Sequence, residues 1–444
     1  MSIRSSLCMA LLLTIVPVIA SATDGPKPAD STLAFFRQLN AQPNELARAA
    51  YLTDQAAQLS PADRSIAMQL LAGAESELGL YNEAIRDFPL APHLPDNPKL
   101  PIAAEWHVTD AVDTIANLVA KRRIVLINEA HHDAHTRQLT LALLPRLRTL
   151  GFTHFAAEAL SEEDAALMQR GYPIATSGTE YLHEPLYGEI IRTAIRLGFV
   201  IVPYDSTATT VTEREAGQAD HLYQKIFAKD SNARVFVHAG YAHIDKAKGR
   251  LDHTVPMAMH LQEATGIEPF SIDQTDFRDV DSGNEIDPYH QMIAAFHPQH
   301  PTVLLNNADG HAWSIDPKKF DVSVMLPLEV DRSANTDTYK AAWATFGMEG
   351  IAVKQVPHAE PRPKWLSLNG QRHPLPIDTA LCAKNIPCVI EAHYAAEPDT
   401  ATAADRYMFI EANTANTLYL FPGHYRLRAW GANGKTLGEK SIEL

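Results

Sequence analysis

Short, wholly apolar runs that alternate with helical patterns occupy the middle of the chain and limit what it can fold into. The runs are "RRIVLIN", "GFTHFAAE", "GFVIVPYD" and "ARVFVHAG". They lack the apolar-polar alternation of a strand with one wet face, so they predict strands buried on both faces. Segments whose apolar residues have helical spacing lie between these runs: one helix is predicted to end near Leu150, and others are predicted over 186–197 and 213–228. We therefore predict an α/β domain over 102–335, a central parallel or mixed sheet flanked by helices. The later runs "TVLLNN" and "FDVSVMLPLEV" could add strands to the same sheet.

Ionisable residues follow the predicted strands at the points where these strands end. Because the carboxyl ends of parallel strands share one edge of a sheet, where ligands bind, these side chains are expected to converge. A chance placement of Glu129, His132, Glu158 and His243 after separate strands is the less favoured explanation. The candidate catalytic residues are Glu129, His132, Glu158 and His243, and the candidate supporting residues are His131, Asp205, Arg214, Glu215 and His238.

Structural explanations apply to several of these side chains. Asp205 could equally cap a turn or a helix. His131 could point away from its neighbour, because successive residues of an extended backbone face opposite sides. The isolated residues His154 and His183 are interpreted as structural.

The flanking segments differ in pattern from the middle of the chain. Residues 24–90 have a helical pattern, and the stretch around Gly79 is typical of one tetratricopeptide (TPR-like) helix pair, which would brace the next domain. A proline-rich linker is predicted over 91–101. From 354 to 444, short strand patterns, including a hairpin around "GANG", predict an all-β sandwich with an accessory role.

The first 22 residues have the charge, apolar run and small-residue ending of a secretory signal, with cleavage near Ala22. The apolar run is shorter than the roughly 20 residues that a spanning helix needs, so no membrane insertion of the mature chain is expected. Cys382 and Cys388 are then the remaining cysteines, and a disulfide between them is favoured over a metal site. A periplasmic or secreted location follows as an expectation.

The net charge and the absence of several common motifs disfavour some classes of function. A formal net charge of -15 argues against nucleic-acid binding, which requires clustered Lys and Arg. The sequence contains no G-x-S-x-G elbow, no phosphate loop and no H-E-x-x-H zinc helix, which disfavours serine hydrolases and nucleotide-triphosphate enzymes. The expected partner is a small-molecule substrate.

The middle domain resembles the erythromycin-esterase-like superfamily and its ChaN-like and TIKI/TraB relatives. The resemblance rests on "NEAHH" with Glu129 and His132, "HFAAE" with Glu158, and "VHAGYAH" with His243, and it covers about half of the chain. The helix "TEREAGQADHLYQKI" is also similar to a family helix, which would place Arg214 and Glu215 near the site. Asn128 replaces the Gly of erythromycin esterases, and "AGYAH" is closer to the ChaN-like and TIKI/TraB pattern.

The resemblance implies a hydrolase for an ester, lactone or amide-type substrate. His132 would be the general base, oriented by Glu129 or Glu158, while His243 would stabilise the oxyanion or position water, with acid-base help worth about 10²- to 10⁴-fold. A divalent metal held by His132, Glu158 and His243 is an almost equal alternative. The alternative from another class is a haem- or iron-binding protein of the ChaN-like type, with His243 and Tyr241 as ligands. The substrate and the oligomeric state stay open.

Overall fold

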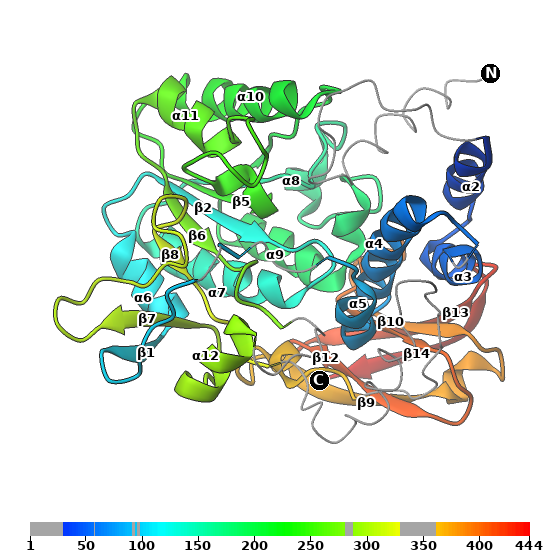
Figure 1. Ribbon diagram of the computed structural model, residues 1–444. Helices are drawn as coiled ribbons and strands as arrows, with labels where there is room; N and C mark the ends of the chain where they lie inside the picture. The colour runs from blue at the N-terminus through cyan, green and yellow to red at the C-terminus, as the bar shows by residue number, and fades with distance from the viewer. Residues whose placement is uncertain (1–29, 57, 91–93, 96–97, 280–286, 329–360) are drawn as a thin grey trace.

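The computed structural model describes residues 30–444 except 57, 91–93, 96–97, 280–286 and 329–360, so the predicted signal segment lies outside the described residues. A six-stranded sheet with the order β4-β3-β5-β2-β6-β8 forms the centre of the molecule (Figure 1). Every neighbouring pair in it is parallel, which confirms the α/β prediction. The strands are β2 (Ile124–Glu129), β3 (His154–Ala157), β4 (Val200–Pro203), β5 (Val235–Gly240), β6 (Phe270–Asp273) and β8 (Val322–Ser323).

Helices cover both faces of the sheet, which explains why its central strands are apolar throughout. Alternate residues of β2 enter different hydrophobic clusters: Val125 and Ile127 face one layer of helices, while Ile124 and Leu126 face the other. The first layer contains α6 (Ala111–Leu118), α7 (His135–Thr149) and α9 (Pro185–Arg196), and the second contains α10 (Val211–Leu222), α11 (Met257–Thr265) and α12 (Pro288–Phe296). Short helical segments complete the domain: α8 (Leu167–Arg170), η1 (Glu180–His183), η2 (Tyr223–Phe227) and η3 (Tyr241–Ile244).

Two details of the sheet differ from the sequence prediction. The run "TVLLNN" forms β7 (Thr302–Asn306), which pairs antiparallel with β1 (Trp106–Asp110) in a separate two-stranded sheet rather than joining the central one. The central sheet instead gains β6, whose sequence "FSID" is too short and polar to stand out as a buried strand. Its parallel partner β8 comes from "FDVSVMLPLEV" and contributes two residues at the sheet edge.

The N-terminal segment is helical, as predicted. Its helices are α2 (Asp30–Asn40), α3 (Glu45–Ala56), α4 (Pro61–Glu77) and α5 (Tyr81–Asp87). The turn between α4 and α5 requires glycine at Gly79, where φ is +78° and an added Cβ would lie 2.1 Å from the backbone oxygen of Arg406. Next to it, the carbonyl of Leu78 accepts a hydrogen bond from the backbone N–H of Met408 at 3.0 Å. The helix pair thus docks closely on a C-terminal strand.

The C-terminal segment contains antiparallel strands in two sheets, one ordered β11-β10-β13-β14 and the other β12-β9. They are β9 (His373–Asp378), β10 (Cys388–Tyr394), β11 (Asp405–Phe409), β12 (Ala415–Leu420), β13 (His424–Gly431) and β14 (Thr436–Glu443), with short helical turns η5 (Lys364–Ser367) and η6 (Thr379–Cys382). The predicted hairpin around "GANG" corresponds to β13 and β14, and Cys382 and Cys388 form the predicted disulfide.

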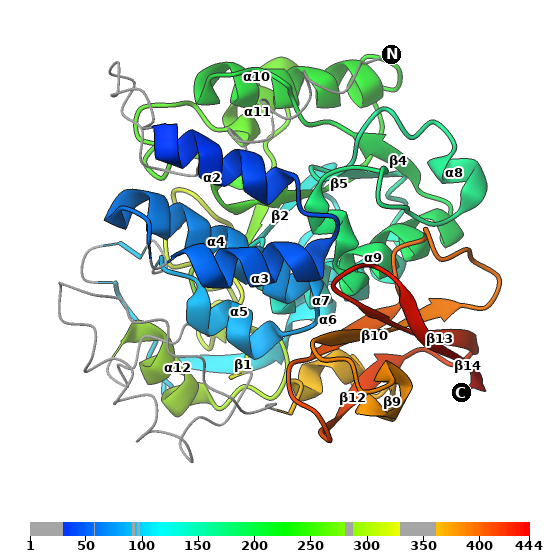
Figure 2. The ribbon, with the colours of Figure 1, turned by 90° about the vertical axis from the view of Figure 1, so that its right-hand side faces the viewer.

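The two ends of the chain share one hydrophobic core. Side chains of the N-terminal helices, such as Leu52 and Leu71, belong to the same buried cluster as Val389 and Phe409 of the C-terminal strands. Figure 2 shows these helices in front of the central domain, with α5 beside the C-terminal strands. The N-terminal helices therefore brace the β unit as well as the α/β domain. Within the described residues, no helix combines the length and the apolar character required to cross a bilayer.

Candidate functional site at the carboxyl edge of the sheet

The carboxyl edge of β3, β5 and β2 brings together most of the candidate residues. These strands are neighbours in the sheet, and their register aligns Glu129 with Gly240 and Ala157 with His238. Glu158, which follows Ala157, donates its backbone N–H to the carbonyl of His238 at 3.1 Å. The two carboxylates therefore start from adjacent positions across β5.

Glu129 and His131 form the first carboxylate–imidazole pair of the site. Oε1 of Glu129 lies 3.0 Å from Nδ1 of His131. Its Oε2 accepts a hydrogen bond from Nε of Arg137 at 2.5 Å and lies 3.1 Å from Nε2 of His238. Burial alone would raise the pKa of Glu129, but the charges of Arg137 and His238 hold this pKa well below its usual range. Glu129 is thus a buried carboxylate that fixes the orientation of His131.

His131, rather than His132, faces this cluster. Its ring stacks on that of Tyr181, with centroids 4.1 Å apart and an interplanar angle of 8°. A Cβ added to Gly240 would lie 2.4 Å from Cε1 and 2.5 Å from Nε2 of His131, so the ring edge opposite Glu129 lies directly against Gly240. The side chain is 18% exposed and is therefore within reach of solvent.

His132 occupies a different environment. Its ring is stacked on Phe88, with centroids 3.4 Å apart, and its Nδ1 lies 3.2 Å from the hydroxyl of Tyr241. Burial, helped by the positive charge of Arg278, lowers the pKa of His132 well below its usual value. The tight turn that follows β2, closed by a bridge between Ala130 and Asp133, separates the directions of the two neighbouring imidazoles. The predicted contact between Glu129 and His132 is therefore corrected: the imidazole beside Glu129 belongs to His131.

Glu158 is the centre of a second group of charges. Its Oε1 accepts a hydrogen bond from Nη2 of Arg214 at 2.6 Å, and its Oε2 accepts one from the backbone N–H of Gly240. Arg214 also donates to both oxygens of Asp205, at 3.0 and 2.9 Å. Asp205 therefore positions a guanidinium at the site, in addition to accepting the backbone N–H of Ser206.

His243 lies between two carboxylates. Its Nε2 is 3.3 Å from Oε1 of Glu158, and its Nδ1 is 2.6 Å from Oε1 of Glu215. Burial alone would lower the pKa of His243, but Glu215 and Glu158 raise it to about 10. Glu215 is fully buried and its other oxygen accepts the backbone N–H of Met257 at 2.7 Å, so the pair is rigidly placed. His243 is consequently a cation at neutral pH.

Several residues that support the site were missed by sequence reasoning. Arg137 joins Glu129 to Glu184, whose Oε2 accepts from Nη1 of Arg137 at 3.1 Å. The other oxygen of Glu184 accepts a hydrogen bond from the hydroxyl of Tyr81, in α5, at 2.8 Å. The only signal for Arg137 was its place in the segment "HTRQL" (135–139), which closely follows "LINEAHHD" (126–133) and is buried in the structure. Tyr81 and Phe88 are far from this stretch in the sequence. The N-terminal segment thus contacts the site through the ring of Phe88 and the hydroxyl of Tyr81.

The predicted metal ligands do not form a cluster at this edge. Among the described residues, the one group of His, Cys, Asp or Glu ligand atoms within 4.8 Å of one another is Glu45, Glu77 and His183. His132 faces Phe88, and Arg214 supplies the positive charge beside Glu158 and His243. Haem iron would have to displace a carboxylate to reach either ring nitrogen of His243. The residues at this edge therefore fit neither a divalent metal ion nor haem iron.

Comparison with known proteins adds little to this geometry. No family model matches the chain, and no curated protein matches it. Among solved structures, the type III effector HopBA1 matches with a TM-score of 0.31 and 13% identity, over 52% of this chain and 100% of that one. RRSP, a MARTX toxin effector domain from Vibrio vulnificus CMCP6, matches with a TM-score of 0.29 and 15% identity, over 61% of this chain and 70% of that one. At these TM-scores the likeness carries no inference about fold or function.

Proposed function

We propose that the chain is a hydrolase that activates water with His131 and acts on an ester, lactone or amide-type small substrate. The observation that carries this proposal is the pair formed by Glu129 and His131, with Nδ1 and Oε1 3.0 Å apart in a side chain that is 18% exposed. The resemblance of "NEAHH", "HFAAE" and "VHAGYAH" to erythromycin-esterase-like proteins supports the same chemistry.

The carboxylate decides which nitrogen of His131 can act as a base. Glu129 is ionised and can only accept a hydrogen bond, so Nδ1 of His131 carries the hydrogen of the neutral ring. Nε2 then carries the lone pair of the ring, on the edge that faces Gly240. An imidazole held in this tautomer by a buried carboxylate can take a proton from water as the water attacks a carbonyl carbon.

Positive charge for the tetrahedral intermediate is present on the other side of the site. His243 is protonated, and Arg214 lies with its Nη1 3.4 Å from Nε2 of His243. Both cations are held in place by Glu158, Asp205 and Glu215 before any substrate binds. Among the nitrogens of these two cations, Nη1 of Arg214 is the one that contacts no carboxylate of the described residues, and it would stabilise a developing oxyanion from a preorganised position. The proton that His131 takes from water would pass to the leaving oxygen or nitrogen, which completes hydrolysis without an acyl-enzyme.

We place this activity in the periplasm or outside the cell, after removal of the first 22 residues. The predicted secretory signal and the Cys382–Cys388 disulfide support this location, because structural disulfides persist in oxidising compartments.

A panel of chromogenic esters, lactones and amides, assayed with the purified chain and with His131→Ala, tests the proposal. Turnover by the wild type that falls at least 100-fold in His131→Ala, but not in the matched variant His154→Ala, is the expected result. His154 is a suitable control because it is half-buried on the opposite end of β3, where its Nδ1 lies 2.8 Å from Oγ1 of Thr153. Turnover that survives in His131→Ala would refute the role of this residue, and a wild type that hydrolyses no member of the panel would refute the proposed reaction.

A further inference from the structure

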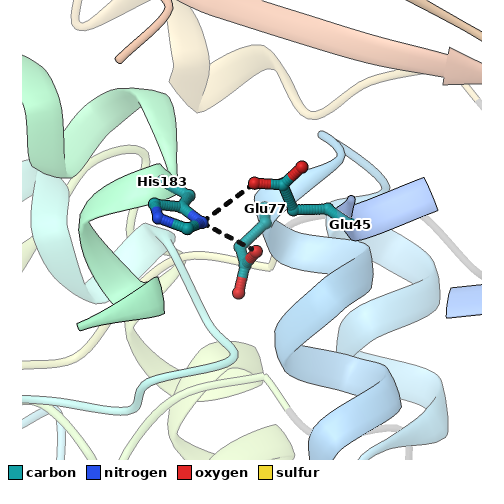
Figure 3. A group of neighbouring side chains, drawn as sticks. All are labelled: Glu45, Glu77 and His183. Carbon is teal, nitrogen blue, oxygen red and sulfur yellow. Dashed lines mark ion pairs between the residues drawn. The ribbon is translucent and has the colours of Figure 1, made fainter. Parts of the chain in front are cut away.

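A second group of ligand-type side chains lies where the N-terminal helices meet the α/β domain. Glu45 begins α3, Glu77 ends α4, and His183 ends the short helix η1. Figure 3 shows the two carboxylates and the imidazole pointing toward one another. Nδ1 of His183 lies 2.9 Å from Oε1 of Glu45 and 3.7 Å from Oε2 of Glu77.

The contact at Nε2 of His183 determines which ring nitrogen has the lone pair. Nε2 of His183 lies 3.3 Å from the carbonyl oxygen of Ala175, which can only accept, so Nε2 carries a hydrogen. The neutral ring would therefore direct the lone pair of Nδ1 toward two carboxylate oxygens. Three electron-rich atoms that converge in this way require a cation between them, either a proton or a metal ion.

Glu77 gives an independent indication that a ligand is missing. The residue is only 4% exposed, and its Oε2 is buried without a hydrogen-bond partner among the described residues. At 3.7 Å, the imidazole of His183 is too far away to satisfy this oxygen by a hydrogen bond. A buried carboxylate oxygen left in this state is costly, because it has lost its hydration without replacement.

We propose that Glu45, Glu77 and His183 bind one divalent transition-metal ion, with zinc preferred. One imidazole nitrogen and two carboxylate oxygens within 4.8 Å of one another are the ligand types and spacing of a zinc site that keeps a position open for water. The carbonyl of Ala175 is the usual kind of outer partner that orients a histidine ligand.

A cavity beside the cluster would give an ion access to it. Glu45 and His183 line a cavity of about 370 Å³ between the N-terminal helices, the segment before η1 and the C-terminal strands, which provides an entry path. Two arginines act on the carboxylates: the charge of Arg406, which lies 3.5 Å from Glu391, acts on Glu45, and the charge of Arg48 acts on Glu77.

The ion would connect distant parts of the fold. It would bind α3 and α4 to η1, and η1 also carries Tyr181, which stacks on His131 in the candidate active site. Metal binding is therefore expected to stabilise the contact between the N-terminal helices and the α/β domain.

Proton release gives a test that is independent of enzymatic activity. Without a metal, burial opposes the charge on His183, but the neighbouring carboxylates of Glu45 and Glu77 raise the pKa of His183 to about 10. A metal ion bound at Nδ1 must displace this proton. The experiment is calorimetric titration of Zn²⁺ into chelator-treated chain at pH 8, in two buffers that differ in ionisation enthalpy. One Zn²⁺ per chain, release of about one proton per ion and a higher Tm are expected.

Variants separate this site from adventitious binding to surface histidines. Glu77→Gln is expected to weaken Zn²⁺ binding at least tenfold, whereas Glu180→Gln, on the same short helix η1 as His183, is expected to bind as the wild type does. If circular dichroism shows that Glu77→Gln is unfolded, Glu45→Gln decides the question in the same way. The proposal is overturned if the wild type retains no Zn²⁺, or if the folded variant binds as tightly as the wild type.

Discussion

The imidazole of His132 lies flat against the ring of Phe88, with centroids 3.4 Å apart and planes within 6° of each other. This contact joins the end of β2 to the segment that follows α5, 44 positions earlier in the chain by residue number. It explains why two adjacent histidines have different environments: His132 is held by an aromatic partner, while His131 is directed toward Glu129 and Gly240.

The first prediction compares these two histidines. His131→Ala should lower kcat by about 10²- to 10⁴-fold with little change in Tm, because it removes the base from a partly exposed position. His132→Ala should instead lower the free energy of unfolding by about 2 kcal/mol or more, because it removes a buried, stacked ring. Steady-state kinetics and urea denaturation of both variants check this. The opposite pattern would restore His132 as the base.

The second prediction uses the close approach of Gly240 to His131. The backbone of Gly240 has φ of −76°, which alanine adopts readily, so Gly240→Ala introduces steric overlap without backbone strain. Its methyl group would lie 2.4 Å from Cε1 of His131 and must displace the ring. Activity should therefore fall at least tenfold while the fold persists, as measured by kinetics and circular dichroism.

The matched control is Gly73→Ala, in the interior of α4, where an added Cβ has no neighbour within 4 Å. It should leave kcat unchanged and stabilise the chain by about 0.5–1 kcal/mol through helix propensity. Unaltered activity in Gly240→Ala would mean that the position of His131 does not control turnover.

The fold was predictable where local sequence pattern and burial agree. The runs that formed β2, β3, β4 and β5 are apolar throughout because helices cover both faces, and this signal can be recognised in the sequence. The strand β6 and the pairing of β7 with β1 were not predictable in this way. Short strands with mixed composition are determined by their neighbours in space rather than by their own residues.

The candidate site was predictable in its location but not in its detail. Polar residues after parallel strands identified the correct edge of the sheet, because topology alone places those ends together. The choice between His131 and His132 depended on the turn from Ala130 to Asp133 and on Phe88, which no local pattern indicates.

The third prediction concerns pH. The pKa of His243 is raised to about 10 by Glu215 and Glu158, against a usual value near 6.5 in the unfolded chain. Its charge therefore contributes stability that is fully present below about pH 6.5 and is lost as the pH rises through about 10. Each such group gives a slope of up to about 1.4 kcal/mol per pH unit in this window.

His243→Gln should accordingly have a free energy of unfolding that falls less steeply than that of the wild type between pH 7 and pH 10. His183, whose pKa is also raised to about 10, contributes to the slope that remains in the variant. Urea denaturation at four pH values across this range measures the difference. Parallel curves for the two proteins would mean that His243 does not carry a proton between its carboxylates.

The last prediction concerns the link between the N-terminal helices and the catalytic edge. The hydroxyl of Tyr81 donates to Glu184, Glu184 accepts from Arg137, and Arg137 donates to Glu129. In Tyr81→Phe, Oε1 of the buried Glu184 carboxylate loses the hydrogen bond from the tyrosine hydroxyl. The variant should therefore have a free energy of unfolding that is lower by about 1.5–3 kcal/mol.

The same variant should reduce kcat several-fold, because Arg137 then holds Glu129, and through it His131, less firmly. Tyr51→Phe is the matched control: its hydroxyl bonds to the side chain of Gln38 at 3.1 Å on the exposed face of the helices, far from this chain of contacts. It should cost about 0.5–1 kcal/mol or less and leave kcat unchanged. If Tyr81→Phe lowers stability but not kcat, the N-terminal helices only brace the domain; if it lowers both, they take part in positioning the catalytic imidazole.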